Sequence, residues 1–281
     1  MDLIVQAAVI GLLQGLTEFI PVSSSAHLAL FPWAAGWTSS PVINSLAFDV
    51  FLHLGTGLAL LIYFARDWLR YLRALLASIA ERRIGGDADR RVAWLLVIAT
   101  IPAAVIGFLG EDLINEVFHG DSDAVRLAIA GFLVIGAVGL WLADRLGARA
   151  ERMDDIGTGA ALTVGFSQAL ALLPGISRSG ATITTGLALG MTRAAAARFS
   201  FLLATPITLG AGLYGSRKML TEAHSGNEWL AIAVGFGVAI VSGLLAISFL
   251  LAWLRSRSVT VFSVYRIGLA VAVVILVVAG R

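Results

Sequence analysis

The sequence predicts an all-α polytopic membrane protein with six transmembrane helices and two re-entrant helix hairpins, arranged as an inverted repeat. The chain has 281 residues, of which 58% are hydrophobic and only 14% are charged, and its mean hydropathy is +0.89. A soluble domain of this size needs far more polar surface. The apolar stretches lack the alternation of apolar and polar residues that a membrane barrel requires, so helices are the expected spanning form.

Six apolar stretches carry few or no charges and approach the roughly 20 residues that cross a hydrocarbon core about 30 Å thick. These predicted spans are Phe48 to Ala65, Val92 to Gly110, Arg126 to Ala143, Ala195 to Ser216, Trp229 to Leu251 and Val261 to Ala279.

Two further apolar stretches, residues 3–35 and 158–190, are interrupted at mid-length. The first is broken by Pro-Val-Ser-Ser-Ser at residues 21–25, and the second by Pro-Gly-Ile-Ser-Arg-Ser-Gly at residues 174–180. Such breaks occur at membrane depth only where they are buried in protein or line a wet cavity. Both stretches are therefore predicted to be hairpins that return to the side from which they enter.

The two hairpin regions also resemble each other in sequence. The matches are Gly11-Leu12-Leu13-Gln14 with Gly165-Phe166-Ser167-Gln168 at an offset of 154 residues, Pro21 and Ser24 with Pro174 and Ser177 at 153, and Phe51-Leu52 with Phe201-Leu202 at 150. They predict one membrane domain, residues 1–281, built from two repeats at about residues 1–143 and 158–281. A hairpin and three spans in each repeat would leave the second repeat inverted relative to the first.

The distribution of arginine predicts the orientation of the chain, because loops on the cytoplasmic side carry an excess of positive charge. Seven arginines lie between the first two predicted spans, and the same side receives Arg145, Arg149, Arg152, Arg193, Arg198, Arg255 and Arg257. Residues 36–47 contain no lysine or arginine, and neither do residues 111–125. A multi-pass protein of the bacterial inner membrane is expected, with both termini on the outer side. The formal net charge is only +2, and no nucleic-acid partner is expected.

Arg178 stands inside the second broken stretch, where a guanidinium is costly unless it is paired or hydrated. Glycine-rich backbone before a helix start leaves N–H groups free for an anion, and a forked cation adds to this preference. We interpret the segment as a phosphate site lined by Gly175, Ser177, Ser179 and Thr182. The alternative is that Arg178 is only a structural counter-ion to Glu18.

The first broken stretch supplies groups of complementary chemistry. Glu18 lies four residues after Gln14, on the same helix face, and is followed by three serines at residues 23–25 and by His27. A carboxylate, a hydroxyl and an imidazole within ten residues can make an activated nucleophile. The alternative for the serines is helix capping. For His53, four residues after Asp49, hydrogen bonding at the membrane interface is the expected role.

Two segments carry a resemblance to a known family. The segments Gln14-Gly15-Leu16-Thr17-Glu18-Phe19-Ile20-Pro21-Val22-Ser23-Ser24-Ser25-Ala26-His27 and Pro174-Gly175-Ile176-Ser177-Arg178-Ser179-Gly180-Ala181-Thr182 resemble the two signatures of the bacterial undecaprenyl-diphosphatase family, the bacitracin-resistance family of cell-wall lipid recycling. The predicted repeats and spans extend the likeness over essentially the whole chain.

The resemblance implies hydrolysis of undecaprenyl diphosphate to undecaprenyl phosphate and inorganic phosphate. By resemblance, the catalytic positions are Glu18, Ser24, His27 and Arg178, and the residues lining the site include Gln14, Ser23, Ser25, Ser177 and Thr182. The family is held to use Mg²⁺ or Ca²⁺. Gln14 stands where many members have a glutamate, which weakens any arrangement in which two carboxylates chelate the metal.

Several alternatives stay open at the level of sequence. An inverted repeat with two broken helices is also the architecture of transporters, so the chain could instead carry or flip a phospho-prenyl lipid. The nucleophile could be Ser24, a water activated by Glu18, or His27. Neither the length of the prenyl chain nor a homodimeric state follows from the residues.

Overall fold

The computed structural model describes residues 2–37, 40–118, 122–222 and 224–280, and within these ranges the elements are helices joined by loops. The helices are α1 (Leu3–Phe19), α2 (Ser24–Ala35), α3 (Leu46–Tyr63), α4 (Ala65–Ala80), α5 (Ala88–Phe118), α6 (Asp123–Leu146), η1 (Met153–Asp155), α7 (Thr158–Gln168), η2 (Ala169–Leu172), α8 (Arg178–Ala188), α9 (Arg193–Thr221), α10 (Gly226–Trp253) and α11 (Thr260–Val278). Residues 119–121, in one predicted outer loop, lie outside the described ranges.

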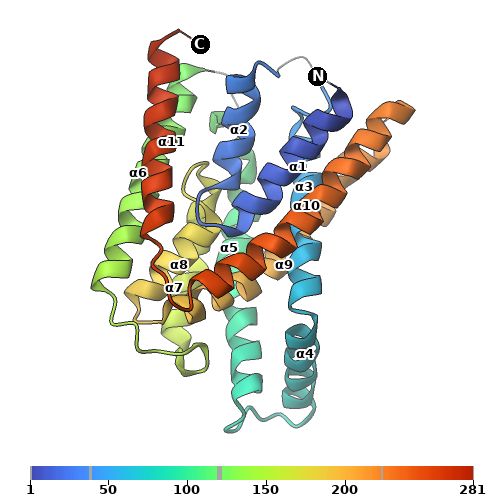
Figure 1. Ribbon diagram of the computed structural model, residues 1–281. Coiled ribbons are helices and arrows are strands. Elements are labelled where there is room, and N and C mark those ends of the chain that lie inside the picture. The colour runs from blue at the N-terminus through green and yellow to red at the C-terminus, as the bar shows by residue number, and fades with distance from the viewer. Residues whose placement is uncertain (1, 38–39, 119–121, 223, 281) are drawn as a thin grey trace.

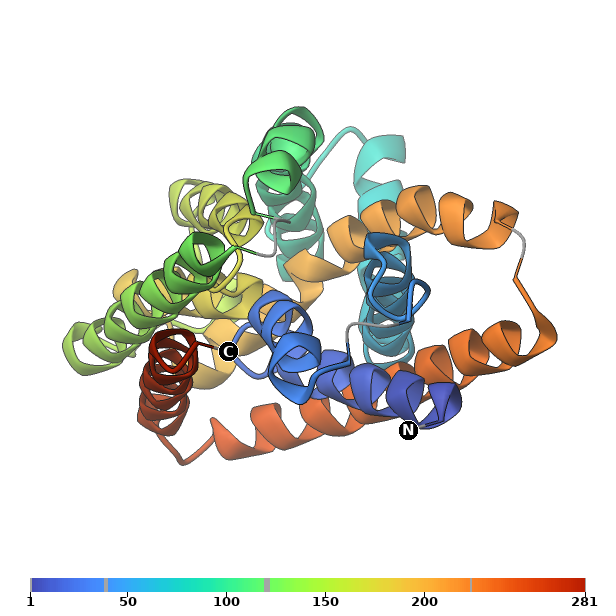
Figure 2. The ribbon, with the colours of Figure 1, turned by 90° about the horizontal axis from the view of Figure 1, so that it is seen from above.

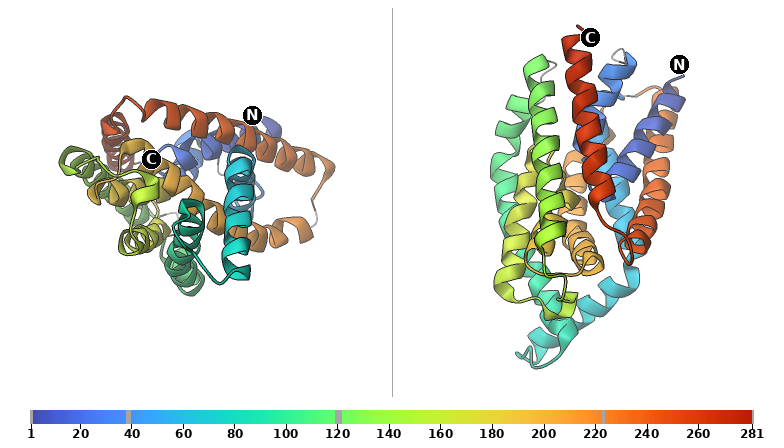
Figure 3. Two further views of the ribbon diagram at one scale, coloured as in Figure 1. Left: turned by 90° about the horizontal axis from the view of Figure 1, so that it is seen from below. Right: turned by 60° about the vertical axis from the view of Figure 1, so that its left-hand side comes forward.

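The described part of the chain contains six helices that are long and apolar enough to cross a membrane. They lie in α3, α5, α6, α9, α10 and α11, and each coincides with one predicted span. The structure therefore confirms the all-helical class and the number and order of the predicted spans, and the chain is a multi-pass membrane protein. The side view shows α4 projecting beyond the bundle (Figure 3).

The two interrupted stretches each form a pair of short helices. α1 and α2 run down from the end where both chain termini lie and back toward it (Figure 1). α7 and α8 return to the opposite end, where the backbone N–H of Ala150 and that of Glu151 both donate to the carbonyl of Gly190. Seen from above, the α1–α2 pair lies among the longer helices (Figure 2).

The turns that begin α2 and α8 have the same geometry. Ser23 and Ser177 have positive φ angles of 77° and 72°, and each caps its helix by accepting a backbone N–H three residues later. The structural partner of Ser177 is therefore Ser23, at an offset of 154, and the pairing of Ser24 with Ser177 at an offset of 153 is wrong by one residue. Ser24 corresponds in position to Arg178.

Glycines allow two pairs of helices to approach closely. A Cβ on Gly11 of α1 would overlap the carbonyl of Gly235 on α10, and a Cβ on Gly165 of α7 would overlap the carbonyl of Ala99 on α5. Small residues at crossings bring backbones together in membranes, where van der Waals contact drives helix association. α3 packs against α9 and α6 packs against α11. The crossings of α1 with α10 and of α7 with α5 hold each short-helix pair against a long helix.

Candidate active site

The tips of the two short-helix pairs contact each other. The backbone N–H of Gly175 donates to Ser23 Oγ over 3.2 Å, and Ser179 Oγ donates to the backbone carbonyl of Glu18 over 3.3 Å. Both helices α2 and α8 therefore begin at one place, and the positive ends of their dipoles favour an anion there.

Glu18 is the centre of this contact and is only 8% exposed. Its Oε1 accepts a hydrogen bond of 2.5 Å from Arg178 Nη2, and its Oε2 accepts one of 2.6 Å from Ser24 Oγ. Gln14 Nε2 also donates to Oε2, at 3.2 Å, and His53 Nε2 lies 3.5 Å from the same oxygen. A carboxylate, a guanidinium and a hydroxyl predicted from separate motifs thus form one cluster.

Arg178 divides its guanidinium between two acceptors. Nη2 bonds Glu18, and Nη1 donates to Thr208 Oγ1 of α9 over 2.7 Å. The ion pair with Glu18, expected if Arg178 were only a counter-ion, is present. However, Arg178 also lines a cavity, so the pair leaves its guanidinium within reach of a bound anion.

The three serines of the first hairpin have different partners. Ser23 caps α2, as the capping alternative predicts, and Ser25 Oγ lies 3.2 Å from Ser23 Oγ. Ser24 instead donates its hydroxyl proton to Glu18. Ser24 and Ser25 both line the larger cavity, but of the three hydroxyls it is that of Ser24 that donates to a carboxylate.

His27 lies away from this cluster. Its Nδ1 is 2.7 Å from the backbone carbonyl of Ser23, and its Nε2 is 2.7 Å from the hydroxyl of Tyr265 on α11. Both ring nitrogens are thus engaged by groups other than Glu18 and Ser24. His53 is the histidine that faces the carboxylate, with its Nδ1 bonded to the carbonyl of Asp49.

The remaining predicted positions support the start of α8. Ser177 Oγ accepts from the N–H of Gly180, and its hydroxyl lies 3.2 Å from that of Ser179. Thr182 Oγ1 donates to the carbonyl of Arg178 over 2.8 Å and lies 2.6 Å from Ser200 Oγ. Thr182 therefore holds the backbone of Arg178 and is itself fully buried.

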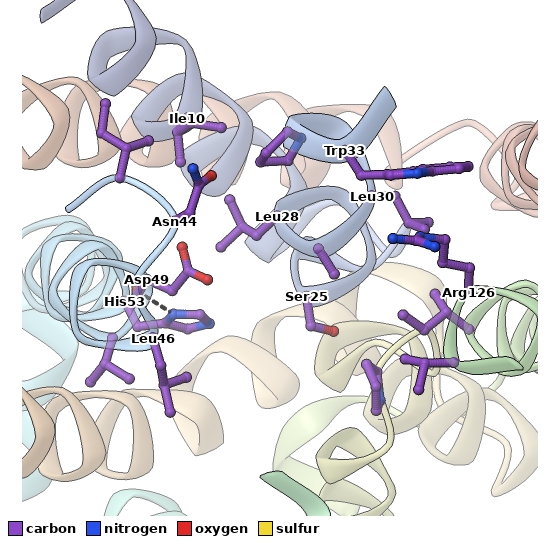
Figure 4. Close-up of a pocket in the computed structure, with 17 residues that line it drawn as sticks. Ile10, Ser25, Leu28, Leu30, Trp33, Asn44, Leu46, Asp49, His53 and Arg126 are labelled. Atoms are coloured by element: carbon purple, nitrogen blue, oxygen red, sulfur yellow. Dashed lines mark hydrogen bonds between the residues drawn. The ribbon is translucent and has the colours of Figure 1, made fainter. Parts of the chain in front are cut away.

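Two cavities meet at the cluster. One, of about 570 Å³, is lined by Glu18, Ser24 and Arg178 and extends between α5 and α9. The other, of about 390 Å³, has Asp49 and His53 on one wall and Arg126 on the other (Figure 4). Ser25 and His53 line both cavities, so the two cavities adjoin beside the cluster.

Comparison with known proteins identifies the family. The family described as "Bacitracin resistance protein BacA" matches residues 7–272. This chain belongs to the BacA family. A protein named undecaprenyl-diphosphatase from Thermomicrobium roseum is 43% identical over 279 residues, covering 98% of this chain and 99% of that one. Proteins of the same name from Desulforudis audaxviator and Pelobacter propionicus are 45% and 41% identical, over 96% and 99% of this chain and 97% and 98% of theirs.

Two buried amides in this BacA-family chain have unpaired atoms. Gln14 Oε1 has no hydrogen-bond partner among the described residues, and neither amide atom of Gln168 has one. Gln168, which matches Gln14 in the sequence comparison of the two interrupted stretches, lines the 570 Å³ cavity. The repeat match pointed to Gln168, but the sequence alone did not indicate that its amide lies in the site.

A divalent cation would find few protein ligands here. Among the described residues, no three His, Cys, Asp or Glu side chains gather as a metal cage. Glu18 and the unpaired Oε1 of Gln14 are oxygen donors of the kind that Mg²⁺ and Ca²⁺ prefer. Of the two, Glu18 is the one that lines the cavity, where a cation would share it with the oxygens of a bound diphosphate.

Arg266 is a functional candidate that the sequence analysis missed. Its side chain is fully buried, and its Nη2 donates to the carbonyls of Gly175 and Ile176 over 2.7 and 3.0 Å. Its Nε donates to the carbonyl of Leu133 on α6. Arg266 therefore fixes the loop that precedes Arg178. The signal in the sequence was an arginine inside the last predicted span.

The contact of Arg266 with α6 gives a stability prediction. A Cβ on Gly136 would overlap the Arg266 guanidinium, whereas a Cβ on Gly131 of the same helix meets open space. We expect Gly136→Ala to lower the stability of the detergent-purified protein by about 1–3 kcal/mol, because the buried guanidinium must leave its carbonyl partners. Thermal unfolding measures this. Gly131→Ala controls for helix propensity, and equal melting temperatures would contradict the role given to Arg266.

Proposed function

We propose that this chain hydrolyses undecaprenyl diphosphate to undecaprenyl phosphate and inorganic phosphate, and so returns the lipid carrier to cell-wall synthesis. The relatives named undecaprenyl-diphosphatase match it over nearly their full length. The observation that carries the proposal is the cluster of Glu18, Ser24 and Arg178 at a cavity that extends between two spanning helices. That arrangement suits a substrate with an anionic head and a lipid tail.

Arg178 is proposed to hold the diphosphate. A phosphate oxygen entering the cavity competes with Glu18 for the guanidinium, which offers paired donors in a fixed fork. The N-termini of α2 and α8 add favourable dipoles at the same place, and the unpaired amide of Gln168 supplies a further donor. Once Arg178 turns to the phosphate, Glu18 loses its counter-ion and becomes a better base for the hydroxyl it already binds.

Ser24 is proposed as the nucleophile. Its oxygen attacks the terminal phosphorus, its proton passes to Glu18 Oε2 at 2.6 Å, and the bond to the bridging oxygen breaks to release undecaprenyl phosphate. Arg178 stabilises the charge that develops. Glu18 passes this proton to the oxygen of the departing phosphate, then takes a proton from the water that attacks the phosphoserine and returns it to the Ser24 oxygen as inorganic phosphate leaves. Direct attack by water activated by Glu18 is the alternative.

The two histidines receive different roles in this proposal. His27 supports the Ser23 turn, through its contacts with the Ser23 carbonyl and Tyr265, and does not move the proton. His53 is the imidazole that lies close enough to Glu18 to assist the transfer of a proton to or from this carboxylate. His27 as nucleophile is the option with the least support.

A divalent cation, Mg²⁺ or Ca²⁺, is proposed to bind with the substrate through Glu18 and Gln14. When bound, it neutralises charge on the diphosphate. Every group in the proposal comes from one chain, so a homodimer, which the sequence leaves open, enters none of the steps.

The inverted repeat is proposed as the plan of the fold, with α1–α2 and α7–α8 as re-entrant hairpins in one domain, residues 1–281. The packing supports it. α1 lies against α10, and its counterpart α7 lies against α5, which is the counterpart of α10. The corresponding pairs α3 and α9, and α6 and α11, pack against each other. Two hairpins entering from opposite sides would bring their tips together near mid-membrane.

The rival function, a carrier or flippase, uses the same architecture. In that case Arg178 would bind cargo and Glu18 would couple protons, but a carrier has no need of a hydroxyl held by a base. The Ser24–Glu18 contact therefore favours hydrolysis.

The orientation in the inner membrane can be tested by labelling. The chain has no cysteine, so single cysteines are unambiguous reporters. With both termini outside, Asn227→Cys should react with a membrane-impermeant thiol reagent applied to the outer face of the inner membrane in spheroplasts, and Ala88→Cys only after lysis. Both positions are exposed at the starts of α10 and α5. The reverse pattern would invert the proposed topology.

The function is tested with purified protein in detergent, where no membrane has to be crossed. We expect release of inorganic phosphate from undecaprenyl diphosphate, loss of activity with EDTA and recovery with Mg²⁺ or Ca²⁺. Arg178→Ala should lower kcat/KM on the order of 10³-fold. Arg178→Lys should have a kcat/KM between those of Arg178→Ala and wild type, because the charge is kept but the fork is lost. Folded wild-type protein that binds the lipid but releases no phosphate would favour the carrier.

The nucleophile is tested with Ser24→Ala, with Ser25→Ala as the neighbouring control. A covalent mechanism predicts almost complete loss in Ser24→Ala, and acid-quenched wild type should retain labelled phosphate on the protein. A serine that only donates a hydrogen bond predicts a loss of about 10- to 100-fold, or about 1.4–2.7 kcal/mol, without trapped label. Glu18→Gln should abolish trapping, because the hydroxyl loses its base.

A further inference from the structure

The cavity that holds the charged cluster has a second end of a different character. Beyond Arg178 its walls are formed by α5 and α9, with Ala104, Phe108, Gly210 and Tyr214 among the lining residues. Phe108 and Tyr214 are 79% and 71% exposed. The cavity thus continues from the buried ion pair to the outer surface of the bundle.

That surface is apolar. Leu109, next to Phe108, is 76% exposed, and Leu213, next to Tyr214, is 62% exposed. Both residue pairs belong to helices long and apolar enough to span the membrane, where such side chains face lipid. The C-terminal ends of α5 and α9 lie well apart when seen from above (Figure 2). The mouth of the cavity therefore opens sideways, toward lipid.

The mouth is also lined by small residues. Ala103, Ala104 and Gly107 stand on the α5 side, and Gly210 and Ala211 stand on the α9 side. A Cβ built on Gly107 or on Gly210 would meet no atom within 4 Å. This space is open, and it is continuous with the site of the anion.

The other cavity has a mixed lining, in which apolar side chains such as Leu28 and Ile129 stand beside charged groups. Its walls include Asn44, Asp49 and Arg126, and Arg126 lies over the ring of Trp33 (Figure 4). These polar groups suit water or a released ion, since burying hydrocarbon against charged groups gains little.

We propose that the mouth between α5 and α9, bounded by Gly107 and Gly210, binds the first isoprene units of the prenyl tail while the diphosphate lies at Arg178. This assignment rests on the proposed function for the identity of the lipid. The argument for it is the shape of a single cavity. One end of this cavity is charged, and the other end is apolar, lined by small residues and open to lipid. The tail remains in the bilayer, and the head reaches the buried cluster without crossing a polar surface.

Blocking variants test the proposal. Gly107→Leu and Gly210→Leu each add a side chain at the mouth, starting from a Cβ that meets open space. We expect the KM for undecaprenyl diphosphate to rise on the order of tenfold or more, because the tail loses its apolar contacts. Competitive inhibition by inorganic diphosphate, which has no tail, should stay at the wild-type constant. Gly237→Leu on α10, also in open space, should behave as wild type.

Two outcomes of this assay would overturn the assignment. One is an unchanged KM in both blocking variants. The other is a parallel weakening of inhibition by inorganic diphosphate, which would mean that the new side chain disturbs the head site and not a tail path.

A second measurement does not depend on turnover. A prenyl diphosphate with a photoreactive group on its first isoprene unit should crosslink to residues 100–109 and 206–214, and excess inorganic diphosphate should prevent this. Crosslinks confined to other helices would overturn the proposal. If wild type is labelled at the mouth but releases no phosphate, the tail site stands and the hydrolytic function fails.

Discussion

The ion pair between Glu18 and Arg178 is the constraint on which the rest of the structure depends. It joins the tips of the two short-helix pairs, which are 160 residues apart in sequence. Burying either charge there without its partner would cost free energy. Removing one partner of a buried pair costs about 3–5 kcal/mol. The pair can form only if both tips reach the same point, and the glycine crossings at Gly11 and Gly165 set the depth of each tip. The fold and the site therefore have a common origin.

Around this pair, the serines and the arginines have different structural roles. Ser23 and Ser177 cap helices, and Ser24 and Arg178, each one position after a capping serine, line the cavity. Arg266 holds the carbonyls of the loop behind Arg178. Two turns of the same geometry thus present a hydroxyl from one side and a guanidinium from the other.

Much of the fold could be predicted because it depends on the composition of short segments. Apolar length sets the six spans, and proline, glycine and serine set the two interruptions. The one-residue error in matching Ser24 to Ser177 arose because Pro21 and Pro174 were aligned. The chain takes a different path from each proline to the capping serine, and only the backbone angles reveal the true correspondence.

The sequence by itself determined the membrane class, the spans and the presence of Glu18, Ser24 and Arg178 in two chemically complementary motifs. The tertiary structure decided which groups meet. His27 and His53 cannot be ranked from spacing, because the direction of each ring depends on how α2 and α3 are rotated against their neighbours. Arg266 reaches the loop before Arg178, and Gln168 lines the cavity, because α11 and α7 pack beside the tips. Local sequence specifies helices and breaks, whereas the contacts between distant segments come from packing.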